Sequence, residues 1–193
     1  MSILDLGFDS PEALLEDVKD MAPFMDAMIA DLGLSENGAV QSIRDGISPH
    51  IVLGLSDDHL DAIFATGLNY MQAGEVAQAQ TVFQKLVTFK SIDYRFWYAL
   101  GTTFQTQERY EDAGRAYLMS LALKATDVDG YLRLGECLLA AGELENALGS
   151  FQTALALCAD GHGQDDQQQI AERRVAYTHQ RLDNSGAGST SIS

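Results

Sequence analysis

Hydrophobic and polar positions along the middle of this chain repeat with a period of 34 residues. Small residues and large aromatic residues carry the period. Glycines, alanines and aromatic residues each recur three times at this spacing: Gly67, Gly101 and Gly135; Ala79, Ala113 and Ala147; Phe83, Tyr117 and Phe151. A fixed period of this length is typical of arrays in which each repeat is one supersecondary unit stacked on its neighbours. We therefore predict three repeats, at residues 60–93, 94–127 and 128–161.

The residue types at these positions match the tetratricopeptide repeat (TPR) signature, in which each repeat folds as two antiparallel helices. Glycine is expected at the eighth position because the two helices approach so closely there that a Cβ would clash. The turn between the helices carries Gly74 and Gly142, which suit a backbone of positive φ, whereas repeat 2 has Glu108. Ser56 is the predicted cap of the first repeat helix. The sequence thus predicts an all-α TPR superhelix over residues 57–160.

A helical extension is predicted before the repeats, within residues 1–56. It begins at Ser10, a capping residue followed by proline, and Pro23 interrupts it, so that we expect either a kink or two short helices. Apolar residues spaced three and four apart form one stripe along it: Leu14, Val18, Met21, Met25, Met28 and Leu32. Such a stripe must pack on something, either the repeats or a second copy of the chain. We favour self-association as a homodimer.

A capping helix is predicted after the repeats, at residues 164–183. Its apolar face carries Ile170, Ala171, Val175 and Leu182, opposite a polar face. Repeat arrays need such a cap because the last repeat would otherwise expose its stacking face. The remaining residues, 184–193, are mainly Gly, Ser and Thr, and we predict that they are disordered.

Composition and charge exclude several classes of function. The net charge of −16 argues against a nucleic-acid partner, which needs a positive surface. No apolar run approaches the ~20 residues of a membrane span, and the start lacks the basic and apolar parts of a signal peptide. We therefore expect a cytoplasmic protein that does not bind membranes.

The residues capable of chemistry are scattered. None of the four histidines pairs with a cysteine or carboxylate at metal-ligand spacing, and neither a phosphate-binding loop nor a nucleophile motif is present. Cys137 and Cys158 are expected to pack as small buried thiols. We expect a protein that is not an enzyme and has no cofactor or metal.

The inner face of the array is the expected binding surface, because the first helix of each repeat lines it through its second, fifth, ninth and twelfth positions. The candidate groove residues are Phe64, Leu68, Met71, Arg95, Tyr98, Thr102, Gln105, Leu132, Glu136 and Leu139, with Asp61 and Asp129 at the second positions. Phe64, Leu68 and Met71 form a continuous apolar strip, and exposed apolar patches mark binding sites. Either a ligand or the N-terminal segment covers this strip, and we favour a ligand, namely an extended peptide with spaced apolar side chains.

Residues 56–159 resemble the class II chaperones of bacterial type III secretion, the SycD/LcrH family. The resemblance rests on the apolar face of repeat 1 and on three motifs: Asp93-Tyr94-Arg95-Phe96, Gly135-Glu136-Cys137-Leu138-Leu139 and Gly142-Glu143-Leu144. It implies a small acidic cytoplasmic protein of a bacterium that keeps pore-forming translocator proteins soluble until export. It also implies that a short extended segment of the translocator binds in the groove and that N-terminal helices form a dimer. Leu68 and Met71 stand where aromatic residues are common in the family.

Other hypotheses remain open at this point. A TPR co-chaperone for a secretion needle subunit would bind an amphipathic helix instead of an extended peptide. A general TPR scaffold would bind a partner in an unrelated complex.

Overall fold

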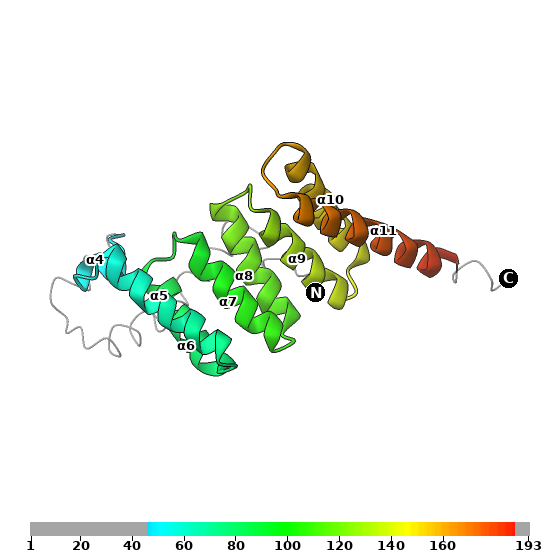
Figure 1. The fold of residues 1–193 in the computed structure, drawn as a ribbon. Coiled ribbons are helices and arrows are strands. Elements are labelled where there is room, and N and C mark those ends of the chain that lie inside the picture. Colours follow the sequence, from blue (N-terminus) through cyan, green and yellow to red (C-terminus); the bar gives the residue numbers. More distant parts are fainter. Residues whose placement is uncertain (1–45, 188–193) are drawn as a thin grey trace, which may run out of the picture.

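The computed structural model of the chain describes residues 46–187, and every regular element in this range is an α-helix (Figure 1). The helices are α4 (Pro49–Val52), α5 (Asp57–Gln72), α6 (Val76–Phe89), α7 (Tyr94–Thr106), α8 (Tyr110–Leu123), α9 (Val128–Ala140), α10 (Leu144–Ala159) and α11 (Asp165–Ala187). The predicted all-α fold is confirmed.

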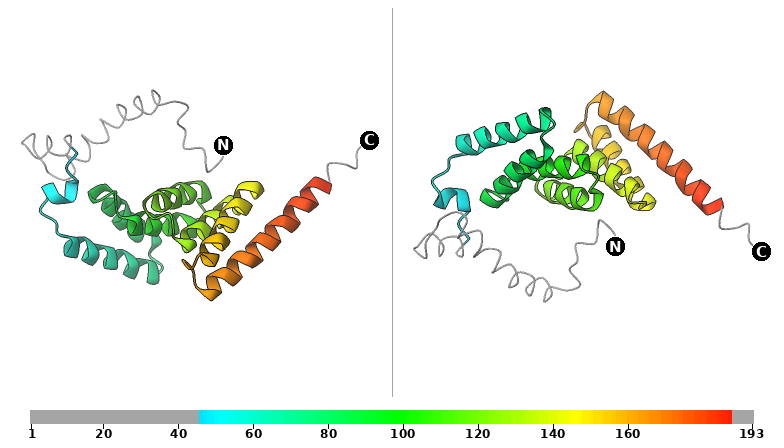
Figure 2. Two further views of the ribbon diagram at one scale, coloured as in Figure 1. Left: turned by 90° about the horizontal axis from the view of Figure 1, so that it is seen from above. Right: turned by 90° about the horizontal axis from the view of Figure 1, so that it is seen from below.

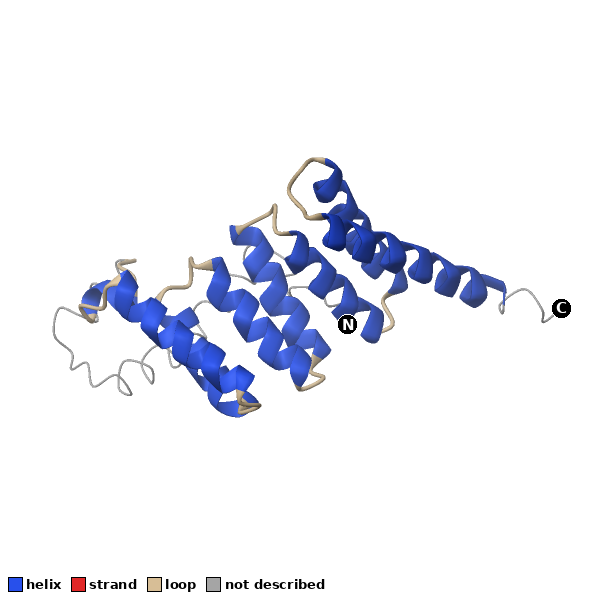
Figure 3. Ribbon diagram, in the orientation of Figure 1, coloured by secondary structure: helices blue, strands red, loops and turns tan. Residues whose placement is uncertain are grey.

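Three helical hairpins stack in chain order and form the body of the molecule (Figures 1 and 3). They pair α5 with α6, α7 with α8, and α9 with α10, and the second helix of each hairpin also packs on the first helix of the next. Helix α11 follows the last hairpin and packs mainly on α10 and also on α9. Figure 2 shows α4 at one end of the array and α11 at the other.

Close approach within each hairpin explains the repeated glycines. A Cβ added to the glycine of the first helix would lie less than 3 Å from the aromatic ring of the second helix, which is completely buried. The pairs and distances are Gly67 and Phe83, 2.5 Å; Gly101 and Tyr117, 2.8 Å; and Gly135 and Phe151, 2.5 Å. The predicted clash is confirmed. Glycine and the aromatic residue recur with the same period because they contact each other in every hairpin.

The turn inside each hairpin requires a left-handed backbone. Gly74 and Gly142 adopt φ values of 77° and 82°, as the sequence predicts. Glu108 occupies the equivalent turn of the second hairpin with φ of 60°. A side chain at positive φ costs roughly 1 kcal/mol, so the second hairpin tolerates a strain that the other two avoid.

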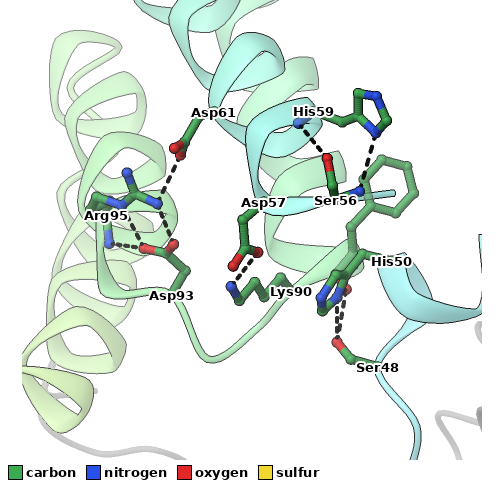
Figure 4. Close-up of polar contacts among 10 residues, drawn as sticks. Ser48, His50, Ser56, Asp57, His59, Asp61, Lys90, Asp93 and Arg95 are labelled. Carbon is green, nitrogen blue, oxygen red and sulfur yellow. Dashed lines mark hydrogen bonds and ion pairs between the residues drawn. The ribbon is translucent and has the colours of Figure 1, made fainter. Parts of the chain in front are cut away.

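The N-terminal end of the array is fixed by local polar contacts (Figure 4). Ser56 Oγ accepts a hydrogen bond from the backbone N–H of His59, and His59 Nδ1 accepts one from the backbone N–H of Ser56. The predicted cap is therefore confirmed, with histidine in the place where capping boxes usually have Glu or Gln. Pro49 begins the short helix α4, and His50 Nδ1 lies 3.1 Å from the Phe89 carbonyl oxygen. This contact holds α4 against the end of α6.

The C-terminal helix packs as predicted along part of its length. Ala171 is fully buried, and Ile170 and Val175 are partly buried against the core. Thr178 is also fully buried, and its hydroxyl donates a hydrogen bond to the Arg174 carbonyl oxygen. The sequence did not indicate this core position because threonine is polar. The helix continues to Ala187. The prediction of disorder from residue 184 onward is therefore wrong for 184–187, where the helical backbone hydrogen bonds simply continue.

Two predictions concern other parts of the chain. The apolar stripe from Leu14 to Leu32 and the tail after residue 187 lie outside the described residues. Within residues 46–187, no helix is both long and apolar enough to cross a membrane.

Candidate binding groove

A cavity of about 430 Å³ opens between the first two hairpins and the start of α9. Its lining comes from four helices and from the turn that follows α8. The lining residues are Phe64, Leu68, Met71, Phe83, Tyr94, Arg95, Tyr98, Ala99, Thr102, Lys124, Asp127 and Asp129. The cavity therefore has an apolar part, built by the first hairpin, and a polar part, built where the second and third repeats meet.

An aromatic cluster holds the apolar wall in place. The Phe64 ring packs between the rings of Phe83 and Phe96, with ring centroids 5.6 and 5.5 Å away. Leu68 lies one turn further along α5 and is 41% exposed, and Met71 is partly buried. Phe64 is thus fixed by its neighbours, whereas Leu68 offers apolar surface that no described residue covers.

Arg95 forms the charged edge beside this wall, and Figure 4 shows its contacts with Asp61 and Asp93. Its Nη2 atom lies 2.7 Å from Asp93 Oδ2 and 3.0 Å from Asp61 Oδ1, and its guanidinium carbon lies 5.7 Å from the centre of the Phe64 ring. Burial opposes ionisation of Asp93, but the hydrogen bonds from Arg95 outweigh it and lower the pKa of that carboxyl. Arg95 is therefore held by two carboxylates while it covers an aromatic face.

Lys124 and two aspartates form the opposite edge. Lys124 Nζ donates to Tyr94 Oη at 3.3 Å, lies 4.4 Å from the Tyr94 ring centre, and forms an ion pair of 3.7 Å with Asp127 Oδ1. Burial raises the pKa of Asp127, and the nearby negative charge of Asp129 adds to this effect. Asp129 is itself exposed.

The inner face of the third repeat is polar, and its central carboxylate, Glu136, is hydrogen-bonded to neighbouring side chains. Glu136 accepts hydrogen bonds from Gln105 at 3.1 Å, Arg133 at 3.3 Å and Arg174 at 2.7 Å. Tyr117 donates in turn to Gln105 Oε1 at 2.8 Å. These contacts join α7, α9 and α11, so the C-terminal helix closes this half of the face.

The structure separates the predicted groove residues into two groups. Those that line the cavity are Phe64, Leu68, Met71, Arg95, Tyr98 and Thr102. Gln105 and Glu136 belong to the polar network, and Leu139 packs partly buried against the core. Leu132 is only 6% exposed, so the expectation that it faces a ligand is wrong. The position of a residue within its repeat gives the face of the helix on which its side chain lies, but packing against the core buries the side chain of Leu132.

The rule based on the second, fifth, ninth and twelfth positions of each repeat does not identify all the residues that line the cavity. Phe83 belongs to a second helix, and its signal in the sequence is the aromatic period itself. Lys124 and Asp127 lie in the turn between repeats, where a rule for the first helices does not apply.

Among the described residues, those that line the cavity include neither a histidine nor a cysteine. No three His, Cys, Asp or Glu residues there are grouped so that they could hold a metal ion. Burial raises the pKa of Cys137 to about 12, so this thiol stays protonated at neutral pH. The geometry supports binding of a ligand by shape, apolar contact and charge.

Comparison with known proteins shows what the chain is similar to. A model of the tetratricopeptide repeat family matches residues 64–128 and 98–162. The low calcium response locus protein H of Yersinia pestis is 30% identical over 106 residues, which are 55% of this chain and 63% of that protein. The chain thus spans a little under two thirds of the length of this curated relative.

Solved structures extend the comparison. PcrH of Pseudomonas aeruginosa in complex with the chaperone binding region of PopB is 32% identical, with a TM-score of 0.57, covering 64% of this chain and 97% of PcrH. PcrH in complex with the chaperone binding region of PopD is 30% identical, with a TM-score of 0.61, and the match covers 67% of this chain and 97% of PcrH. SycD of Yersinia enterocolitica, a type III secretion translocator chaperone seen in an alternative dimer, shares the fold at 24% identity, with a TM-score of 0.60, covering 66% of this chain and 96% of SycD.

Proposed function

This chain belongs to the tetratricopeptide repeat family, and we propose that it is a translocator chaperone of type III secretion that binds an extended apolar segment of a translocator. The observation that carries the proposal is the cavity of about 430 Å³ beside Phe64, Leu68 and Met71. The PcrH complexes with chaperone binding regions support it. The segment would be held there until export, which implies a cytoplasmic protein that acts without catalysis.

The chemistry of the wall sets the mode of binding. An extended peptide presents alternate side chains to one side, so two apolar side chains two positions apart can enter one cavity. Each buried aliphatic side chain contributes about 1.5–3 kcal/mol, from which the cost of ordering the peptide is subtracted. Two or three such anchors give an affinity on the order of micromolar.

A pair of leucine variants tests this function. Leu68 and Leu123 are both 41% exposed, but only Leu68 lines the cavity. We expect Leu68→Ser to weaken binding of the chaperone binding region of PopB by about tenfold or more, the equivalent of one lost anchor. Leu123→Ser should leave that affinity unchanged. Isothermal titration calorimetry gives both values, and equal affinities for the two variants would contradict the proposed site.

A cellular experiment tests the chaperone role. Co-expression with a membrane-active secreted protein should keep that protein soluble, and the double variant Phe64→Ala with Leu68→Ala should abolish this effect. Because Phe64 packs on two other rings, the double variant needs circular dichroism to show that it is folded. Capture of a small amphipathic helix instead of an extended segment would indicate a needle-subunit client.

We also propose that the chain forms a homodimer through the stripe of Leu14, Val18, Met21, Met25, Met28 and Leu32. The regular spacing of this stripe in the sequence supports the proposal. Sedimentation equilibrium of the full chain tests it, with Met21→Glu and Met25→Glu expected to give a monomer. A dimer that persists in both variants would place the interface elsewhere.

A further inference from the structure

The cations at the edge of the cavity are already paired with carboxylates. Arg95 is bound by Asp93 and Asp61. Lys124 is shared between the Tyr94 hydroxyl and Asp127. An acidic side chain that entered this cavity would find neither cation available without first breaking one of these contacts.

One carboxylate at the same edge has no such partner. The second positions of the three repeats carry Asp61, Arg95 and Asp129, and side chains at this position can reach each other between repeats, as the 3.0 Å pair of Arg95 with Asp61 shows. Arg95 is turned toward the first of these aspartates. The Asp129 side chain, which lines the cavity and is exposed, makes no ion pair or hydrogen bond with another residue of the range 46–187.

The surroundings of Asp129 make the edge negative. Its charge is close enough to Asp127 to contribute to the raised pKa of that carboxyl, after the larger effect of burial. Four carboxylates, Asp61, Asp93, Asp127 and Asp129, stand against three cations, Arg95, Lys124 and Arg133, the last of which lies beside the lining residue Tyr98. A positive side chain at this point would gain a partner and relieve the repulsion between two of the carboxylates.

We infer that the segment bound in this cavity carries a lysine or arginine beside its apolar anchor, and that Asp129 selects it. The inference rests on the proposed function, and it adds the charge of the client to the apolar character already argued. The apolar wall supplies the affinity, while the third-repeat edge discriminates between clients. The preference weakens as salt rises, because Asp129 is exposed to solvent.

Fluorescein-labelled peptides with a Leu-Ser-Leu core test the inference. A variable residue, placed either before or after the core, is lysine, glutamine or glutamate. We expect at least one placement in which lysine binds about threefold to tenfold more tightly than glutamate in low salt, measured by fluorescence polarisation, the range for an exposed ion pair together with the lost repulsion. Asp129→Asn should remove this preference, so that the lysine, glutamine and glutamate peptides of that placement bind this variant equally tightly.

The matched control is Asp165→Asn. Asp165 is also an exposed aspartate in the first turn of a helix, and its replacement changes the net charge of the chain equally. It should leave the lysine preference intact. No charge preference in the native chain, or equal loss in the two variants, would overturn the inference. If the glutamine peptide fails to bind, or binds equally to Leu68→Ser, the proposed function fails as well, so the two failures are distinct.

Discussion

The two halves of the inner face use equivalent repeat positions but differ in chemistry. Leu68 and Glu136 both occupy the ninth position of their repeats. Leu68 is 41% exposed beside a cavity, whereas Glu136 accepts hydrogen bonds from three helices. The position in the repeat therefore determines on which face a side chain lies, and the neighbouring helices determine whether that side chain is exposed to a ligand.

The difference follows from the ends of the array. Helix α11 packs at one end, and its Arg174 reaches the inner face of the third repeat. At the other end of the array, the short α4 packs on α6 of the first hairpin. Under the proposed function, the open half binds a client, and the closed half stabilises the array.

The largest expected effect is on the hairpin contact that both halves share. Gly135→Ala should lower the free energy of unfolding by about 2–4 kcal/mol, because the new Cβ would lie 2.5 Å from the buried Phe151 ring. Gly149→Ala is the control, since that glycine lies in the same hairpin with nothing within 4 Å. It should be stabilising through helix propensity. Urea denaturation measures both, and equal effects would refute the close-contact explanation.

A change in the closed half should separate stability from binding. Glu136→Ala leaves Arg174 and Gln105 without their acceptor, so we expect a loss of about 1–2 kcal/mol in the free energy of unfolding. Peptide affinity in the cavity should stay within twofold, since Glu136 does not line it. Loss of affinity as large as that of Leu68→Ser would show that the two halves act as one site.

The edge of the open half should give a pH-dependent stability. The pKa of Asp93 is lowered in the folded chain, so its ionised form stabilises the fold above the pKa of the unfolded chain, and this stabilisation is lost as pH falls through the folded value. Asp93→Asn should therefore cost about 1 kcal/mol at pH 7. The difference should shrink as pH falls below the ordinary pKa of an aspartate, about 4. Chemical denaturation at pH 7 and at successively lower pH checks this, and a difference independent of pH would assign the loss to the hydrogen bond that Asp93 accepts from the backbone N–H of Arg95 at the start of α7.

The smallest expected effect concerns the strained turn between the two halves. Glu108→Gly should stabilise the chain by about 0.5 kcal/mol, because relief of the positive φ exceeds the added flexibility of the unfolded chain. Thermal unfolding should show a slightly higher midpoint. Gly142→Ala, at the equivalent turn with φ of 82°, should have the opposite sign.

Much of the fold could be predicted from short-range patterns. The pairing of Gly67 with Phe83 follows from one period, and the turn at Gly74 and the cap at Ser56 follow from local backbone chemistry. These features need only residues that are close in sequence or related by a constant spacing.

The candidate site could be predicted only in part. The apolar wall follows from helical spacing on α5, because residues three and four apart share a face. The opposite edge of the cavity could not be predicted in this way, since Lys124 and Asp127 lie in a turn between repeats. The burial of Leu132 depends on packing that its position number does not specify.

The sequence by itself determined the all-α repeat, its register and the side of the array on which each residue emerges, because periodicity encodes direction. Only the tertiary structure decided which of those residues are available to a ligand. The contacts of Glu136 with Gln105 and Arg174 join residues 31 and 38 positions apart. Such contacts depend on how far long side chains reach between stacked helices, and periodicity does not specify that distance.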